Sequence, residues 1–386
     1  MFDMANLDFY LISVLIFIGF FAVLIFKDRK NIEIKGILFI RRTKKGKGFL
    51  DRIARKSPKF WKIFGSLGVL VCFGGMAFGL YFLLNSLIFP TGAPSLSLVI
   101  PFPTNETTVG YGFIGVPFWY FIIGVMTLIF SHEGMHGVLA RAEKIKIKNM
   151  GLLMLLVIPG AFVEPDEKQL KKADWKTKIR IYAGGSFSNF LLAGLVVLII
   201  FLFISPVLLM EGVGYLGYVN STKYGAEPYP AQTLNMTSAI ISIDGQRIRN
   251  VEELSEFMEK TKPGQVVTIE TYSENYKVTL AENPDNPNLG FIGLSGVGDT
   301  QMIKSEYKGT SFYGIIEFLL EMLGWIWIIN IGVGLVNIFP IKPLDGGLMM
   351  EALSEKFAPK YKKEIVRFFS AIFLSLIISN FLIGFI

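Results

Sequence analysis

The chain contains six long apolar stretches, and they restrict its fold more than any other feature. A helix that spans a membrane needs about 20 mostly apolar residues. The stretches occupy residues 9–26, 63–89, 111–137, 181–210, 311–339 and 368–386. Hydrophobic residues make up 52% of the chain, which excludes an ordinary soluble globular protein. We therefore expect an α-helical polytopic membrane protein of the cell membrane with about six transmembrane helices.

Basic residues are unevenly distributed between these stretches, although the formal net charge is only +7. They concentrate in the connections 27–62, 141–180 and 341–367. Cytoplasmic loops carry an excess of Lys and Arg, so we expect these three connections inside the cell and residues 211–310 outside. Nucleic-acid binding by the first connection is the weaker interpretation, because a basic loop next to two spans obeys the same rule.

Residues 211–310 are polar and predict a separate α+β domain inserted between two spans. Strand-like alternation at 265–280 follows a helix-like segment at 251–262. The insert resembles a PDZ domain, which binds extended peptides by adding a strand to its sheet. The resemblance is carried by "YPAQTL" (229–234), "IISIDG" (240–245), the helix-like segment and "KPGQVVTI" (262–269). A spacer without a ligand remains the alternative.

The end of the third stretch carries the motif that most directly indicates chemistry, "SHEGMHG" (131–137). His132 and His136 are the only histidines in the chain, and residues four apart share one face of a helix. Two such imidazoles can bind one Zn²⁺, and Glu133 between them is placed to act as a general base on zinc-activated water. Polar residues near lipid headgroups are the structural alternative, but ionisable groups within a span usually serve a function.

A catalytic zinc needs a third protein ligand and an open position for water. Four carboxylates are candidates on the cytoplasmic side: Asp345, Glu164, Asp166 and Glu167. We favour Asp345, in "NIFPIKPLDGG" (337–347), because it closes a span that enters from the same side as the third one. Pro340 and Pro343 would break the helix there and could turn the carboxylate toward a buried metal.

Taken together, the two motifs and the insert between them resemble the site-2 protease family of intramembrane zinc metalloproteases. The similarity joins H-E-x-x-H at the end of one span to N-x-x-P-x-x-P-L-D-G-G at the end of a later span, over about residues 111–350. It implies one Zn²⁺ per chain bound by His132, His136 and Asp345, with Glu133 as the catalytic residue.

Two asparagines gain a possible role from the same resemblance. Asn337 matches the asparagine of the second motif, and "AGGSFSN" (183–189) resembles a family stretch that ends in asparagine and so selects Asn189. The family implies that both line the active site and bind substrate or the oxyanion. Hydrogen bonding between helices is the alternative for each.

The segment 151–167 is apolar but too short to span, and Pro159-Gly160 interrupts it. We expect a strand or hairpin that dips back into the membrane. In the family such an element lies beside the active site and pairs with an unwound substrate. Irregular backbone at membrane depth must find hydrogen-bond partners, and an extended substrate would supply them.

These interpretations predict an enzyme that hydrolyses peptide bonds within or near the transmembrane segments of membrane proteins. Its active site would face the cytoplasm, and its PDZ-like domain would meet the trimmed outer stump of the substrate. A different membrane zinc protease, a metal-dependent peptide-binding scaffold and a metal transporter are the alternatives. The predicted parts are 1–110, 111–210, 211–310, 311–350 and 351–386.

Overall fold

The computed structural model describes residues 4–89, 96–104, 107–110, 112–155, 158–219, 221, 227–303, 307 and 310–383. The chain divides into two compact units. Unit 1 consists of Met1–Ile199 and Leu319–Ile386, and unit 2 of Ile200–Phe318. All six residues predicted for the catalytic and metal site belong to unit 1.

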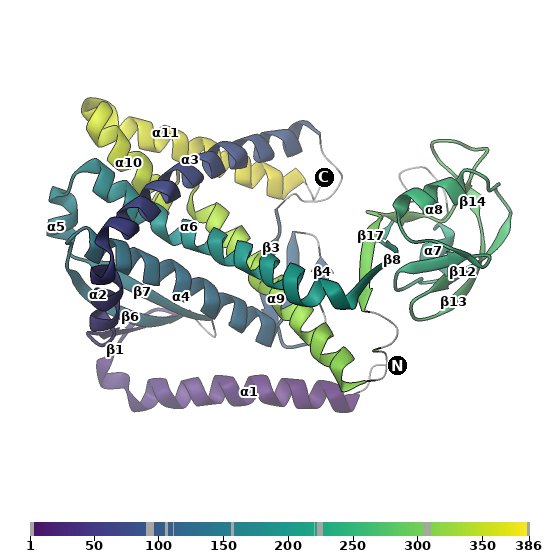
Figure 1. The fold of residues 1–386 in the computed structure, drawn as a ribbon, viewed down its shortest axis with the longest axis horizontal. Coiled ribbons are helices and arrows are strands. Elements are labelled where there is room, and N and C mark those ends of the chain that lie inside the picture. Colours follow the sequence, from purple (N-terminus) through teal and green to yellow (C-terminus); the bar gives the residue numbers. More distant parts are fainter. Residues whose placement is uncertain are drawn as a thin grey trace. The chain divides into compact units, whose positions relative to one another are not determined.

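Within the described residues, six helices are long and apolar enough to cross a membrane. They are α1 (Met4–Lys27), α3 (Pro58–Ile88), α4 (Phe118–Ala142), α6 (Trp175–Ile199), α9 (Ser311–Asn337) and α11 (Lys362–Ile383) (Figure 1). Large apolar side chains such as Leu70 and Phe130 are exposed on them, as expected for surfaces that face lipid. The six helices fit the predicted polytopic membrane protein.

Two of the predicted spans extend into residues that form strands. Residues 113–117 form strand β5 (Phe113–Pro117), paired with β3 (Leu98–Phe102) and β4 (Thr108–Gly110), so α4 begins at Phe118. A short apolar run is ambiguous between a buried strand and a helix, and Pro117 fits before a helix but not inside one.

The second boundary lies at the end of the fourth span. Residues 208–210 belong to strand β8 (Leu208–Gly214), because the helical run ends at Val207 in a 3-10 turn, Ser205–Val207. β8 pairs with β17 (Gly298–Ile303) from Leu208 onward, so the compact unit is wider than the predicted insert at 211–310.

A four-stranded antiparallel sheet lies next to α4 and was only half predicted. Its order is β1 (Ile32–Lys35), β2 (Leu38–Thr43), β6 (Ile147–Leu155) and β7 (Ile158–Pro165). The predicted strand or hairpin at 151–167 corresponds to β6 and β7; its entry into the membrane stays a prediction. The sequence predicted only a basic loop at 27–62, but this segment supplies β1 and β2, with β2 pairing to β6 from Leu38↔Leu155 to Thr43↔Met150.

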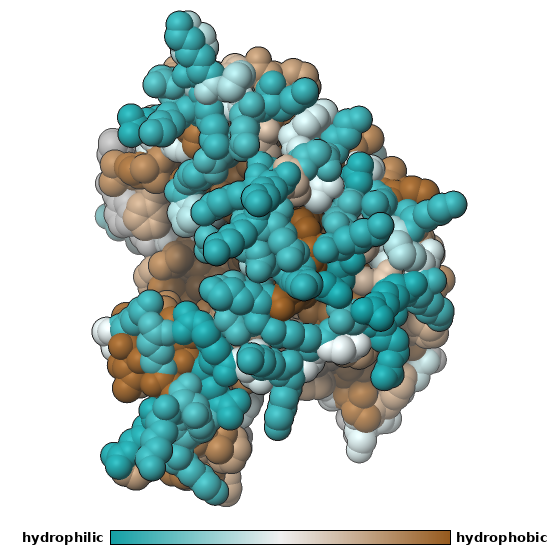
Figure 2. All heavy atoms as spheres, turned by 90° about the vertical axis from the view of Figure 1, so that its left-hand side faces the viewer, coloured by the Kyte–Doolittle hydropathy of each residue, from teal (hydrophilic) through white to brown (hydrophobic). Residues whose placement is uncertain are grey.

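Shorter helices lie near the same end of unit 1 in Figure 1: α2 (Lys47–Lys56), α5 (Glu167–Lys172) and α10 (Asp345–Phe357). They come from the three basic connections, 27–62, 141–180 and 341–367, which the charge pattern predicts on one side of the membrane. The face of the molecule at this end is covered largely by hydrophilic side chains (Figure 2). The arrangement accords with one polar side of a membrane protein, while the sidedness itself remains a prediction.

Unit 2 is an α+β fold with its own apolar core. Its main sheet has the order β13-β12-β10-β8-β17, with β11 paired to β10. The other elements of this sheet are β10 (Ile240–Ile243), β11 (Gln246–Arg247), β12 (Val266–Thr271) and β13 (Asn275–Thr279). Two-stranded pairs are formed by β14 (Ala281–Glu282) with β15 (Gly290–Phe291) and by β9 (Gly217–Tyr218) with β16 (Leu294–Ser295).

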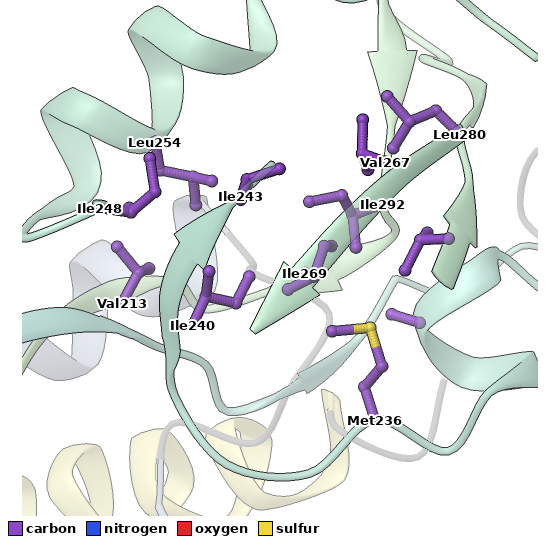
Figure 3. Packing of buried hydrophobic residues seen from close by; sticks show 12 residues of the cluster. Val213, Met236, Ile240, Ile243, Ile248, Leu254, Val267, Ile269, Leu280 and Ile292 are labelled. Atoms are coloured by element: carbon purple, nitrogen blue, oxygen red, sulfur yellow. The ribbon is translucent and has the colours of Figure 1, made fainter. Parts of the chain in front are cut away.

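Helices α7 (Pro230–Thr233) and α8 (Val251–Met258) complete unit 2. Figure 3 shows Leu254 of α8 and Ile248 beside Ile243 of β10, with Ile269 and Val267 of β12 on the same core. The predicted strands and helix are therefore present, and the assignment to the PDZ family remains a prediction.

Candidate metal centre

Three predicted ligands from two helices meet at one point in unit 1. His132 and His136 lie one turn apart on α4, and Asp345 is the first residue of α10. The Oδ2 atom of Asp345 lies 3.2 Å from Nε2 of His132 and 3.2 Å from Nε2 of His136. One ligand atom of each residue lies within 4.8 Å of the other two.

This geometry fits a tetrahedral zinc ion. Bonds of about 2.0–2.1 Å at tetrahedral angles place neighbouring ligand atoms about 3.3 Å apart. The observed 3.2 Å separations match that spacing. Asp345 Oδ2 is also buried, and two imidazole nitrogens lie 3.2 Å from it; a buried carboxylate is costly unless a cation or a proton donor pairs with it. The donor set is therefore suited to Zn²⁺.

Close backbone packing brings Asp345 to the histidines. Helix α9 ends at Asn337, and an irregular turn leads to α10. An added Cβ at Gly346 would lie 1.9 Å from the carbonyl oxygen of Ile338, and one at Gly347 would lie 2.6 Å from the backbone of Ile341. Only glycine permits these approaches, so the glycine pair after Asp345 is part of the site's construction.

Helix α6 forms the wall behind the metal ligands through Gly185. An added Cβ at Gly185 would lie 2.5 Å from Nε2 of His136 and 2.7 Å from Nε2 of His132. The positions of both imidazoles therefore depend on the absence of a side chain at Gly185. This role of Gly185 was not predicted, although the Gly184-Gly185 pair inside an apolar span was a visible signal.

The outer ring nitrogens of both histidines also contact α6. Nδ1 of His136 lies 2.7 Å from the carbonyl oxygen of Ile181. Nδ1 of His132 lies 3.0 Å from the amide nitrogen of Asn189. Such contacts orient metal-binding histidines and select their tautomer.

Asn189 lies behind His132 and not on the open side of the site. Its side chain is fully buried, and its Oδ1 accepts a hydrogen bond from the hydroxyl of Ser131. It is not among the residues that line the cavity next to the metal ligands. The predicted contact between Asn189 and substrate or oxyanion therefore gains no support from its position.

A cavity of about 440 Å³ opens beside the three ligands. Glu133 and Asn337 both line it, as do Phe162 and Val163 of β7. The backbone N–H of Val163 donates a hydrogen bond of 2.9 Å to Oε2 of Glu133. This contact positions the carboxylate at the cavity beside the three predicted ligands.

The three rival carboxylates have other partners. Glu164 accepts hydrogen bonds from Lys148 and Asn149, each at 3.0 Å. The bond from Asn149 is the largest cause of the lowered pKa of Glu164, followed by that from Lys148. Asp166 caps α5, and Glu167 is an exposed partner of Lys171. Among the residues that the structure describes, only His132, His136 and Asp345 form a group able to hold a metal.

The model of peptidase family M50 matches residues 120–377, well over half of the chain. An uncharacterized protein of Methanocaldococcus jannaschii is 27% identical over 341 residues, covering 86% of this chain and 83% of the relative. The matched region contains all six predicted site residues.

Proposed function

The chain belongs to peptidase family M50, the site-2 protease family, and from that premise we propose that it is a zinc-dependent endopeptidase that cuts membrane proteins. The bond that it cuts lies within or near a transmembrane segment of the substrate. The observation that carries the proposal is the convergence of His132, His136 and Asp345 beside a cavity that also contains Glu133.

Each residue of the site has a distinct task in this proposal. Zn²⁺ bound by the three ligands would supply a Lewis acid that makes water a nucleophile near neutral pH. Glu133, at the same cavity, is placed to take a proton from a water molecule and would return it to the leaving amine, as a general base and then a general acid. Asn337 lines the same cavity and can donate its amide hydrogen to the oxyanion.

Strand β7 is the proposed docking edge for an unwound substrate. It is an edge strand of its sheet and lines the cavity through Phe162 and Val163. Exposed strand edges pair readily with extended chains. Val163 donates its N–H to Glu133, so a peptide paired along β7 would lie next to the general base.

The remaining assignments follow from the family and the charge pattern. We place the site near the cytoplasmic face, where water can reach it, and unit 2 outside the membrane. There unit 2 acts as a PDZ-like domain that binds the trimmed stump of a substrate. The lipid bilayer and transmembrane substrates are the proposed partners, and nucleic acid is not.

The test compares Glu133→Gln with Glu167→Gln in purified protein. Both replace a carboxylate by its amide, but Glu167 is an exposed partner of Lys171 on α5, outside strand β7. Loss of a general base lowers rates about 10²–10⁴-fold, so Glu133→Gln should keep its zinc and lose cleavage of a helical membrane substrate. Glu167→Gln should keep both. Wild-type cleavage by Glu133→Gln would refute the mechanism, and peptide binding without any cleavage by the wild type would favour the scaffold.

A further inference from the structure

Helix α2 has two different faces and leads directly into a span. Leu50 and Ala54 on one face are buried, while Phe49, Arg52 and Lys56 are exposed. Spacings of three and seven residues place these three exposed side chains on one stripe of the helix. Span α3 begins two residues after α2 ends, so α2 must lie close to the membrane surface.

The exposed surface of α2 and its flanking turns is basic, and its cations have no partner. The one acidic residue within 44–60 is Asp51, which is paired with Arg141. The exposed basic side chains of this stretch form no hydrogen bond or ion pair with the part of the chain that the structure describes: Lys44, Lys45, Arg52, Arg55, Lys56 and Lys59. The surface therefore offers uncompensated positive charge to a ligand.

The chemistry of this surface fits the phosphate groups of anionic lipids. Clusters of Lys and Arg next to a span are attracted to an anionic leaflet, and basic helices with exposed aromatic residues lie in the headgroup region. Phe49 and Phe60, within the same stretch, are 55% and 53% exposed. Figure 1 shows α2 at one end of α4 and running across the direction of that span, as expected for a helix that lies along a membrane surface.

Nucleic acid also carries phosphates, but lipid is the better partner for this surface. Because α2 is joined to a span, lipid headgroups are always beside it, and nucleic acid would have to displace them. Exposed phenylalanine rings can enter the boundary between headgroups and acyl chains. The charge pattern also predicts this connection on the cytoplasmic side, where the leaflet is anionic.

The buried face of α2 packs on the elements that carry the candidate metal centre. Leu50 shares an apolar core with Val138 of α4 and Val163 of β7. An added Cβ at Gly137 would lie 2.5 Å from Cδ1 of Leu50, so α2 touches α4 directly after the second histidine. Headgroups bound to the exposed face would hold α2 in this place and so stabilise the fold around α4.

We propose that residues 44–60 form a binding surface for anionic phospholipids, and that its occupation stabilises unit 1. The proposal goes beyond the proposed proteolysis and does not depend on it, because none of the predicted site residues belongs to this surface.

The test uses the full-length protein in nanodiscs of phosphatidylcholine with increasing fractions of phosphatidylglycerol. The thermal midpoint of the wild type should rise with the anionic fraction, and about 1 M salt should remove the gain because it shortens the Debye length to about 3 Å. Each cation near an anionic surface strengthens binding about fivefold. Replacing Arg52, Arg55 and Lys56 together by Gln should therefore weaken binding about 100-fold and abolish the gain.

The matched control replaces three exposed lysines outside α2 by Gln: Lys146, Lys168 and Lys172. It removes the same charge and should keep the gain. Both triple variants should have the wild-type midpoint in pure phosphatidylcholine, because these side chains have no partner to lose. No gain in the wild type, or equal loss of the gain in both variants, would overturn the proposal.

A second measurement locates the lipid independently of stability. Photoactivatable phosphatidylglycerol should crosslink to residues 44–60 of the wild type, as mapped by mass spectrometry of its peptides. Crosslinks confined to other parts of the chain would contradict the proposed surface. Binding of a DNA duplex that phosphatidylglycerol does not displace would assign the surface to nucleic acid instead.

Discussion

The role of Gly185 provides the sharpest test of the site's geometry. In Gly185→Ala the new Cβ would lie 2.5 Å from Nε2 of His136 and 2.7 Å from Nε2 of His132. Ordinary contacts between such atoms are about 3.5 Å or longer. The methyl group would therefore have to displace the imidazoles by about 1 Å.

The expected effect follows from the tolerance of zinc ligation. Ligand distances in zinc sites vary by only about 0.2 Å, so at least one histidine would be lost as a ligand. A four-ligand site binds with about 10–16 kcal/mol, which assigns about 3 kcal/mol to one ligand. At 1.4 kcal/mol for each factor of ten, zinc affinity should fall about 100-fold.

The assay is chelator competition on purified protein, with Gly194→Ala as the control. Gly194 lies on the same helix, and an added Cβ there meets nothing within 4 Å. Alanine is favoured over glycine in helices by about 1 kcal/mol, so neither variant should lose its fold, and the thermal midpoint of the metal-free protein checks this. Wild-type zinc affinity in a folded Gly185→Ala protein would refute the reasoning.

Three further predictions concern the aspartate and its helix. Asp345→Asn should lower zinc content while Glu164→Gln leaves it unchanged; the reverse result would reassign the third ligand. Gly346→Ala should lower both the thermal midpoint and zinc content, because its Cβ would lie 1.9 Å from a backbone oxygen; unchanged values would contradict the packing. Burial would raise the pKa of Glu351, but ion pairing that includes Lys342 lowers it below its usual 4.5. The ion pair therefore stabilises the folded protein above pH 4.5, and this stabilisation is lost as the pH falls through the lower pKa of folded Glu351. Glu351→Gln should therefore show a smaller fall of the thermal midpoint at acid pH than the wild type. An unchanged profile of thermal midpoint against pH would exclude this contribution.

Local patterns made much of the architecture predictable. Five or more turns of apolar residues identify a span regardless of what surrounds it, and all six spans appear as helices among the described residues. The spacing of His132 and His136 places both on one helix face for the same reason, since the α-helical repeat is local. The boundaries at Phe118 and Leu208 were missed because a short apolar run does not distinguish a strand from a helix.

The partners of these elements required the folded chain. The pairing of β2 with β6 joins segments about a hundred residues apart, and no local pattern in a basic loop indicates it. The place of Asn189 behind His132, and the space that Gly185 leaves for the two imidazoles, likewise depend on how α6 packs against α4.

By itself, the sequence determined the helices, the H-E-x-x-H motif and four candidates for the third metal ligand. Each of these depends on residues near one another in the chain. The tertiary structure decided that Asp345 reaches the histidines while Glu164 turns to Lys148 and Asn149. The physical reason is that a metal centre is defined by distances between side chains. Those distances depend on helix packing and on turns closed by glycine, which no single stretch of sequence specifies.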